Sequence, residues 1–260
     1  MLIEHLDQPS ASPTVAAPVT KALFASALSA LVLHAGAAAT YSWPTSVDVE
    51  PGGSLLVVEN GRHRVLRVTG RRTTVLAAGL AKPYEARHDL DGTIVLSNAH
   101  LLQRLRPGAR PVTLARASGD IGPIAVARSA VYYTTGTSLF RLGRHAPLVT
   151  GLSGPHGLAV ARDGAVLVSD TGHGRLLRVD ASGRTSTLAR LAEPRGLDVA
   201  ADGIYVAEAS SKHVVHLTAT GRRIGTVGPA FGDPYDVSVA PDGTLYVVDT
   251  AAAGRIVHVR

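Results

Sequence analysis

The chain of 260 residues is 45% hydrophobic and 18% charged, which is the composition of a globular protein long enough to bury a sizeable core. It has no cysteine, which excludes disulfides, thiolate metal sites and cysteine nucleophiles, and its 4% of aromatic residues argues against a surface that stacks nucleic-acid bases. The formal net charge of +6 comes from arginines scattered along the chain, with no basic tract. The charge therefore does not indicate a surface that binds nucleic acid.

The first forty residues have two interpretations. Residues 1–20 are rich in proline and serine, which is typical of a disordered tail. Residues 22–33 are apolar and follow Lys21, and Ala37-Ala38-Ala39 is the kind of small-residue site at which a signal peptide is cleaved. Residues 21–39 therefore read as part of an export signal, although Glu4 and Asp7 are unusual in the segment before one.

From residue 44 onward one pattern recurs six times. Its clearest copy reads Pro155-His-Gly-Leu-Ala-Val, then Asp163-Gly164, then Ala-Val-Leu-Val-Ser-Asp170, then Arg175-Leu-Leu-Arg-Val. The starts are 39, 40, 32, 39 and 40 residues apart, and the third copy is short and lacks the Asp-Gly pair. The copies begin at Pro44, Pro83, Pro123, Pro155, Pro194 and Pro234.

Each copy predicts an antiparallel meander. Its apolar runs are four to six residues long and are separated by turn signals, and Asp-Gly between the first two runs is typical of a tight hairpin. Most copies have four such runs, and the fourth run of the third copy lies at residues 147–150. Because a meander that is apolar on both faces is stable only when packed against others, the sequence predicts an all-β fold, a six-bladed β-propeller of four-stranded blades. The predicted domain spans residues 29–260, after a tail or partial signal peptide at 1–28, and is expected to be a monomer.

The last copy supplies the second interpretation of the N-terminus. It ends at Arg260 after three apolar runs, so a fourth strand is missing. Residues 31–36 read much like the fourth run at 74–79, and we expect them to complete the last blade by pairing with residues 256–259, which would leave no open sheet edge. This interpretation favours a cytoplasmic protein, whereas a cleaved signal peptide would place it outside the cytoplasm. Neither predicts a transmembrane anchor in the mature chain.

The repeat pattern carries a family resemblance. Pro-x-Gly-Leu-x-Val, Asp-Gly, Leu-x-Val-x-Asp and Arg-Leu in this order resemble the NHL repeat, and the array over residues 31–260 is similar to propellers of the superfamily that includes gluconolactonase-like, strictosidine-synthase-like and lyase members. The resemblance implies the fold. It implies no single function, because this scaffold hosts hydrolases, lyases and binding modules.

A recurring acid followed by a base indicates a structural feature. Four copies carry such a pair, five or six residues apart, and Asn98 with Gln103 replaces it in the second copy. Because a catalytic carboxylate is expected in one copy rather than four, we interpret the pairs as ion pairs between the second and third strands. They are Glu59/Arg64, Asp170/Arg175, Glu208/His213 and Asp249/Arg255.

The position after each initiating proline predicts the functional site. It opens the innermost strand, so its side chain is expected at the mouth of the central channel, and it differs from copy to copy. The next position carries a carboxylate in two copies and a small residue in three. The predicted ligand-binding residues are Tyr84, Glu85, His156, Arg195, Tyr235 and Asp236, with Arg195 as an anion clamp.

Three functions are open at this point. The leading one is a non-catalytic module that binds a protein, a glycan or a small polar ligand at the channel mouth, without a cofactor. The second is a metal-assisted hydrolase or lyase like the gluconolactonases or streptogramin lyases, in which Glu85 and Asp236 would hold a divalent cation and His156 would act as the base. The third is an RNA-binding propeller that uses its arginines. Of the zinc-binding histidines of the peptidyl-hydroxyglycine lyases, only His156 has a counterpart here.

Overall fold

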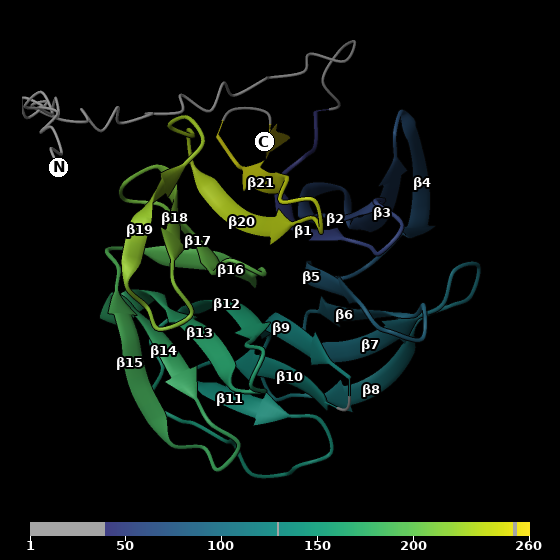
Figure 1. Ribbon diagram of the computed structural model, residues 1–260. Coiled ribbons are helices and arrows are strands. Elements are labelled where there is room, and N and C mark those ends of the chain that lie inside the picture. Colours follow the sequence, from purple (N-terminus) through teal and green to yellow (C-terminus); the bar gives the residue numbers. More distant parts are fainter. Residues whose placement is uncertain (1–39, 129, 252–253) are drawn as a thin grey trace, which may run out of the picture.

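The computed structural model describes residues 40–128, 130–251 and 254–260, and these form the predicted six-bladed β-propeller (Figure 1). Six antiparallel sheets surround a central channel, and the first strand of each sheet lies innermost, against the first strands of its two neighbours. The predicted closing strand at 31–36 and the alternative signal peptide at 21–39 both lie outside the described residues. None of the described helices is long and apolar enough to cross a membrane.

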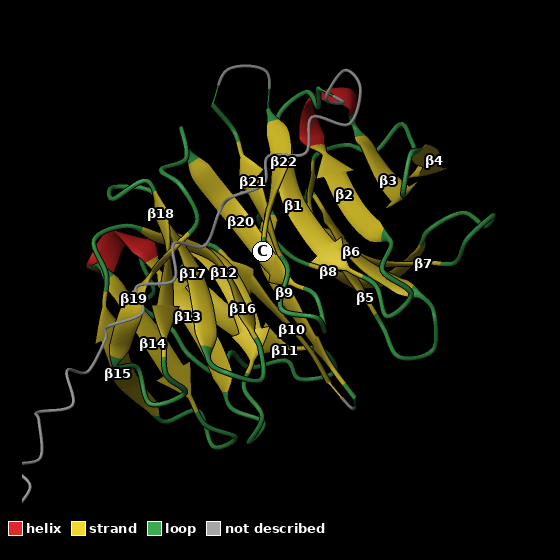
Figure 2. Cartoon of the chain, turned by 45° about the horizontal axis from the view of Figure 1, so that its top comes forward, coloured by secondary structure: helices red, strands yellow, loops and turns green. Residues whose placement is uncertain are grey.

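The blades follow one another along the chain, and two short 3-10 helices join the second and third strands of blades 1 and 4 (red in Figure 2). Blades 1 and 2 comprise β1 (Pro44–Val49), β2 (Leu55–Glu59), η1 (Asn60–Arg62), β3 (Arg64–Thr69), β4 (Arg72–Ala77), β5 (Pro83–His88), β6 (Ile94–Asn98), β7 (Leu101–Leu105) and β8 (Val112–Arg116). Blades 3 and 4 comprise β9 (Ile121–Ala127), β10 (Ala130–Thr135), β11 (Ser138–Arg141), β12 (Pro155–Val160), β13 (Val166–Asp170), η2 (Thr171–His173), β14 (Arg175–Val179) and β15 (Thr185–Arg190). Blades 5 and 6 comprise β16 (Pro194–Val199), β17 (Ile204–Glu208), β18 (His213–Leu217), β19 (Arg223–Val227), β20 (Pro234–Val239), β21 (Leu245–Asp249) and β22 (Arg255–Val259).

Blade 3 departs from the four-stranded prediction. The run at residues 147–150 was expected to be its fourth strand, but it makes only an isolated bridge between Val149 and Leu139 of β11, and the sheet has three strands. The third copy is the shortest of the six, and Pro147 has no N–H to donate to a ladder. In the described residues blade 6 also has three strands, β20, β21 and β22.

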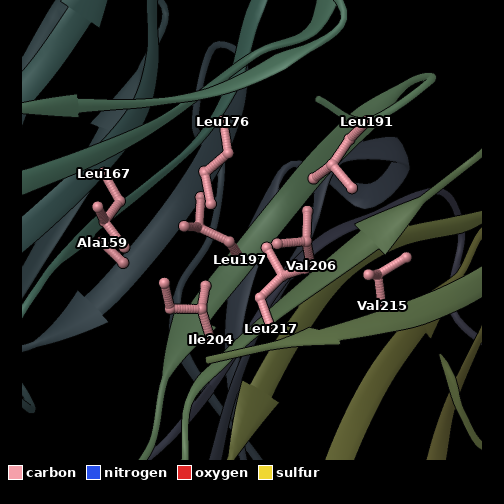
Figure 3. Packing of buried hydrophobic residues seen from close by; sticks show 9 residues of the cluster. All are labelled: Ala159, Leu167, Leu176, Leu191, Leu197, Ile204, Val206, Val215 and Leu217. Atoms are coloured by element: carbon pink, nitrogen blue, oxygen red, sulfur yellow. The ribbon is translucent and has the colours of Figure 1, made fainter. Parts of the chain in front are cut away.

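Apolar side chains fill the spaces between neighbouring blades. Figure 3 shows the cluster between blades 4 and 5, in which every labelled side chain is at most 9% exposed. Burying one such leucine or isoleucine stabilises the fold by about 1.5–3 kcal/mol, so the blades hold one another in place. The cluster consists of Ala159, Leu167, Leu176, Leu191, Leu197, Ile204, Val206, Val215 and Leu217.

The junction between the last and first blades depends more on polar contacts. Its described apolar cluster has only three buried members, Tyr41, Val57 and Leu66. Side chains of β20 instead accept hydrogen bonds from the backbone of β1. The N–H of Val47 donates to Asp236 Oδ2 (3.0 Å), and the N–H of Val49 donates to Ser238 Oγ (3.1 Å). The innermost strands therefore tie the two ends of the ring together.

Three of the four predicted acid–base pairs are ion pairs in the structure. The separations are 2.5 Å for Glu59–Arg64, 2.8 Å for Asp170–Arg175 and 2.9 Å for Asp249–Arg255. The fourth prediction is wrong, because the His213 ring lies 2.6 Å from the carbonyl of Ser211 rather than on Glu208.

The same acids also have a role that the sequence did not predict. Each accepts a backbone N–H from the loop that leads into the innermost strand of its own blade, and each is almost fully buried. They therefore fix the loops that surround the start of the channel. The donors are Ser42 to Glu59, Ser153 to Asp170, Ala192 to Glu208, and Gly232 and Asp233 to Asp249.

Candidate functional site

A β-bulge follows the initiating proline in five innermost strands. The pairing register shifts between Pro44 and Ser46, and similar shifts occur in β5, β12, β16 and β20. The residue after the proline is therefore without a ladder partner, and a bulge of this kind redirects a side chain. In β16 this residue is Arg195. In β1, β5, β12 and β20 the redirected residues are Thr45, Tyr84, His156 and Tyr235.

These side chains meet where the innermost strands begin. They line a pocket of about 480 Å³, here called the mouth pocket, whose walls also include Trp43 and Ile121. The Tyr235 hydroxyl lies 3.4 Å from the Tyr84 hydroxyl, which in turn lies 3.3 Å from the carbonyl oxygen of His156. The structure thus brings together three of the six predicted site residues, Tyr84, His156 and Tyr235. That they bind a ligand stays a prediction.

Arg195 lies beside this group but is already paired. Its guanidinium contacts Asp233 at 2.8 Å and Glu193 at 3.1 Å, and it lies 5.4 Å from the centre of the Tyr235 ring. It borders a second hollow of about 570 Å³, here called the side pocket, together with Tyr41, Trp43, Asp233 and Tyr235. The two carboxylates compete with an anion for this guanidinium, so Arg195 is not a free cation among the described residues, and its role as an anion clamp stays a prediction.

Glu85 and Asp236 lie deeper in the channel, each 3% exposed, and they face Arg87. Arg87 Nη2 contacts Glu85 Oε1 and lies 3.4 Å from Asp236 Oδ1. The remaining oxygens accept backbone N–H groups, from Ile124 to Glu85 Oε2 (2.7 Å) and from Val47 to Asp236 Oδ2. We call Asp48, Glu85, Arg87, Asp198 and Asp236 the Arg87 cluster.

The Arg87 cluster does not suit a divalent cation. Such an ion takes several oxygen ligands, and here the oxygens of Glu85 and Asp236 already accept contacts from a guanidinium and from backbone N–H groups. In the part of the chain that the structure describes, no three histidine, aspartate or glutamate side chains gather as metal ligands would. The guanidinium occupies the place between these two carboxylates that a metal ion would need.

Sequence reasoning missed two residues at the channel. Arg87 had a readable signal, because the same repeat position carries the opposite charge in two other copies, Asp48 and Asp198. Trp43 is 67% exposed and borders both pockets, with a left-handed φ of 48°. Its signal was that the only tryptophan of the chain directly precedes an initiating proline, where the fourth copy has Gly154.

Comparison with known proteins agrees with the fold and the repeat. Residues 152–178, which span β12, β13 and nearly all of β14, match the family model of the NHL repeat. The chain is a six-bladed propeller that contains an NHL repeat. No curated protein is detectably similar to it in sequence.

Several solved structures resemble this NHL-repeat propeller. A gluconolactonase from Xanthomonas campestris has a TM-score of 0.72 at 17% identity, covering 85% of this chain and 86% of that one. Virginiamycin B lyase from Staphylococcus aureus has a TM-score of 0.64 at 15% identity, covering 80% and 78%. A streptogramin B lyase has a TM-score of 0.67 at 13% identity, covering 84% and 94%. At these identities the likeness shows the fold alone.

Four carboxylates lie around the Arg87 guanidinium at the centre of this NHL-repeat propeller, and burial favours the protonated form of three of them. Burial raises the pKa of Glu85 to about 8, with Arg87 opposing the shift and the charge of Asp236 adding to it. Burial also raises the pKa of Asp236, and it raises that of Asp198 to about 6. Burial alone would lower the pKa of Arg87, but the surrounding carboxylates raise it, so the guanidinium stays charged.

The raised pKa of Glu85 predicts that stability falls as the pH rises. An unfolded glutamate titrates near 4.5, so between about pH 4.5 and 8 the folded protein holds a proton that the unfolded chain has released. The stabilisation by this proton is therefore fully present below about pH 4.5 and is lost as the pH rises to about 8. We expect the melting temperature to drop by several degrees from pH 5 to pH 8, and Glu85→Gln to flatten the slope.

Thermal unfolding across this pH range measures the effect. Glu50→Gln is the matched control, because Glu50 pairs with Arg67 near the surface, with 13% of its side chain exposed, and lies outside the Arg87 cluster. A Glu85→Gln profile that parallels the unmodified protein would contradict the assignment of the proton to Glu85.

Proposed function

We propose that the NHL-repeat propeller is a non-catalytic binding module that takes a small polar ligand in the mouth pocket. The observation that carries the proposal is the convergence of Tyr84, His156 and Tyr235, which bulges in three different blades direct into one pocket. A concave site with aromatic walls and a few convergent polar groups is the usual form of a small-ligand site.

The surroundings of His156 support binding rather than acid–base catalysis. Burial lowers its pKa, and the charge of Arg195 lowers it further, so the imidazole is neutral near pH 7. Its Nδ1 atom is buried and makes no hydrogen bond among the described residues. A catalytic histidine is normally oriented by a hydrogen bond from this ring, commonly to a carboxylate.

The two alternative functions have less support. The metal-assisted hydrolase or lyase needs a cation on Glu85 and Asp236, where Arg87 lies instead. The RNA-binding module needs arginines and aromatic rings on one face, whereas two arginines that flank the channel are paired with acids, Arg87 with Glu85 and Arg195 with Asp233.

The single tryptophan provides the test. Because Trp43 borders the mouth pocket, its fluorescence should report a bound ligand directly. We would titrate the full chain with neutral sugars, polyols, amino acids, small carboxylates and divalent cations. At least one organic ligand should change the emission, and Tyr84→Ala and Tyr235→Ala should each weaken it about tenfold, an effect of about 1.4 kcal/mol.

Tyr246→Ala is the matched control for these variants. Tyr246 is also partly buried in blade 6, but it lies on β21 and outside the mouth pocket. The centre of its ring is 6.2 Å from that of His258. Binding unaffected by Tyr84→Ala and Tyr235→Ala would refute the mouth pocket as the site. Turnover of lactone or ester substrates, lost in His156→Ala, would refute the non-catalytic assignment.

A further inference from the structure

We infer that the ligand is a neutral saccharide of at least two rings that lies across Trp43, with one ring in the mouth pocket and the next in the side pocket. This inference rests on the proposed function, because it assigns a chemical class and a length to the ligand of the same site. It depends on three features: the adjacency of the two pockets, the fixed position of Trp43, and the pairing of charges around both.

The two pockets adjoin each other. Trp43 and Tyr235 belong to the walls of both, so the hollows meet at these two side chains. Their volumes, about 480 and 570 Å³, each lie within the range of roughly 300–1,000 Å³ that ligand pockets occupy. A ligand of one ring would use only one of the two pockets.

Trp43 is held in its exposed position by its backbone. Its carbonyl accepts the N–H of Asn60 (3.1 Å), and the preceding carbonyl, of Ser42, accepts the N–H of Gly61 (3.0 Å). A β-carbon added at Gly61 would lie 2.8 Å from that Ser42 carbonyl oxygen, so the two turns are in close contact.

The tryptophan side chain at this position has no evident folding role. Its φ of 48° is unfavourable for a bulky residue, and blade 4 has a glycine at the equivalent position, Gly154, with a φ of 53°. Its side chain is 67% exposed, so it adds little to the core. A strained residue that its neighbours hold rigidly is a hallmark of a functional position. Here it presents an aromatic face between two pockets.

The charges at the pocket rims disfavour an anionic ligand. Lys82 pairs with Asp120 at 2.7 Å beside the mouth pocket, and Arg195 faces two carboxylates, Asp233 and Glu193, beside the side pocket. With a neutral His156, these groups offer no unpaired positive charge that would attract an acidic ligand, so a neutral one is favoured over it.

The side chains that line the two pockets suit both the C–H faces and the hydroxyl groups of a sugar. The C–H faces of a pyranose ring pack on aromatic rings such as Trp43 and Tyr235, whose polar tips remain available. The Tyr84 and Tyr235 hydroxyls are 3.4 Å apart, a long contact that ligand hydroxyl groups can replace at little cost. Aromatic walls, exchangeable hydroxyls and paired charges together are the chemistry that recognises a neutral saccharide.

The test compares chain lengths. The full chain would be titrated by calorimetry with neutral mono-, di-, tri- and tetrasaccharides of glucose, galactose, mannose and N-acetylglucosamine. At least one disaccharide should bind ten times more tightly than its monosaccharide. Trp43→Ala should abolish that tenfold difference, because it should weaken disaccharide binding far more than monosaccharide binding. Val112→Ala is the matched control, because Val112 is 64% exposed on β8 of blade 2 and borders neither pocket.

The outcomes separate this inference from the proposed function. Equal affinity for one and for two rings, unaffected by Trp43→Ala, would overturn the inference and leave the binding module intact. Small carboxylates that bind in a Tyr84-dependent manner, with no saccharide binding, would also overturn only the inference. If acrylamide failed to quench the Trp43 emission of the ligand-free protein, another part of the chain would cover Trp43. This result would also overturn the inference. Binding of no ligand at the mouth pocket would refute the proposed function itself.

Discussion

Replacing Arg87 with methionine is expected to lower the free energy of unfolding by about 3–5 kcal/mol, the usual cost of removing one partner from a buried ion pair. The Arg87 side chain is 12% exposed, and its guanidinium contacts carboxylates from blades 2 and 6, Glu85 and Asp236. It also donates to the carbonyl of Val47 in blade 1 (2.7 Å). Its loss would leave these buried carboxyl groups without their cationic partner where the ring closes.

Urea denaturation of the full chain measures this loss. Arg67→Met is the matched control, because Arg67 pairs with Glu50 with 27% of its side chain exposed and should cost no more than about 1 kcal/mol. Adding Glu85→Gln to Arg87→Met should restore part of the stability, since it replaces a buried carboxyl group that has lost its cationic partner. Equal losses for Arg87→Met and Arg67→Met would show that the Arg87 cluster does not hold the ring together.

The number of blades and most of the strands were predictable from the sequence because the repeat is visible in it. Each copy has an initiating proline, which starts the innermost strand in every blade except blade 3, where β9 begins two residues before Pro123. Asp-Gly turns such as Asp163-Gly164 mark the first hairpin. Gly164 adopts a φ of 84° there, a conformation that few other residues tolerate. The third copy was mispredicted because apolar content alone indicated a strand at residues 147–150, whereas its length and Pro147 permit only a bridge.

The candidate site was predictable only in part. Tyr84, His156 and Tyr235 could be found because they share a repeat position and because innermost strands converge at one end. The pairing of Arg195 could not be found, because Glu193 and Asp233 come from the loops before two different blades. Whether a carboxylate such as Glu85 is free or paired likewise depends on distances across the channel, which a repeat pattern does not contain.

Gly196→Ala is expected to destabilise the propeller by about 3 kcal/mol, at the upper end of the usual cost of overpacking. Gly196 lies on β16, where an added β-carbon would come within 2.1 Å of Asp236 Oδ1 and 2.5 Å of Asp236 Cα on the neighbouring β20. The Cα cannot swing aside as a flexible side chain can, so either the two strands separate or Asp236 leaves Val47 and Arg87.

Gly225→Ala separates this steric effect from the general consequence of replacing a glycine. Gly225 also lies in a strand, β19, and an added β-carbon there would meet nothing within 4 Å. That variant should change the free energy of unfolding by no more than about 0.5 kcal/mol. Because Asp236 links blade 6 to blade 1, Gly196→Ala should weaken the same junction as Arg87→Met, and the double variant should lose less than the two single losses together. Fully additive losses, or a Gly196→Ala protein as stable as Gly225→Ala, would mean that the close approach of β16 and β20 does not support ring closure.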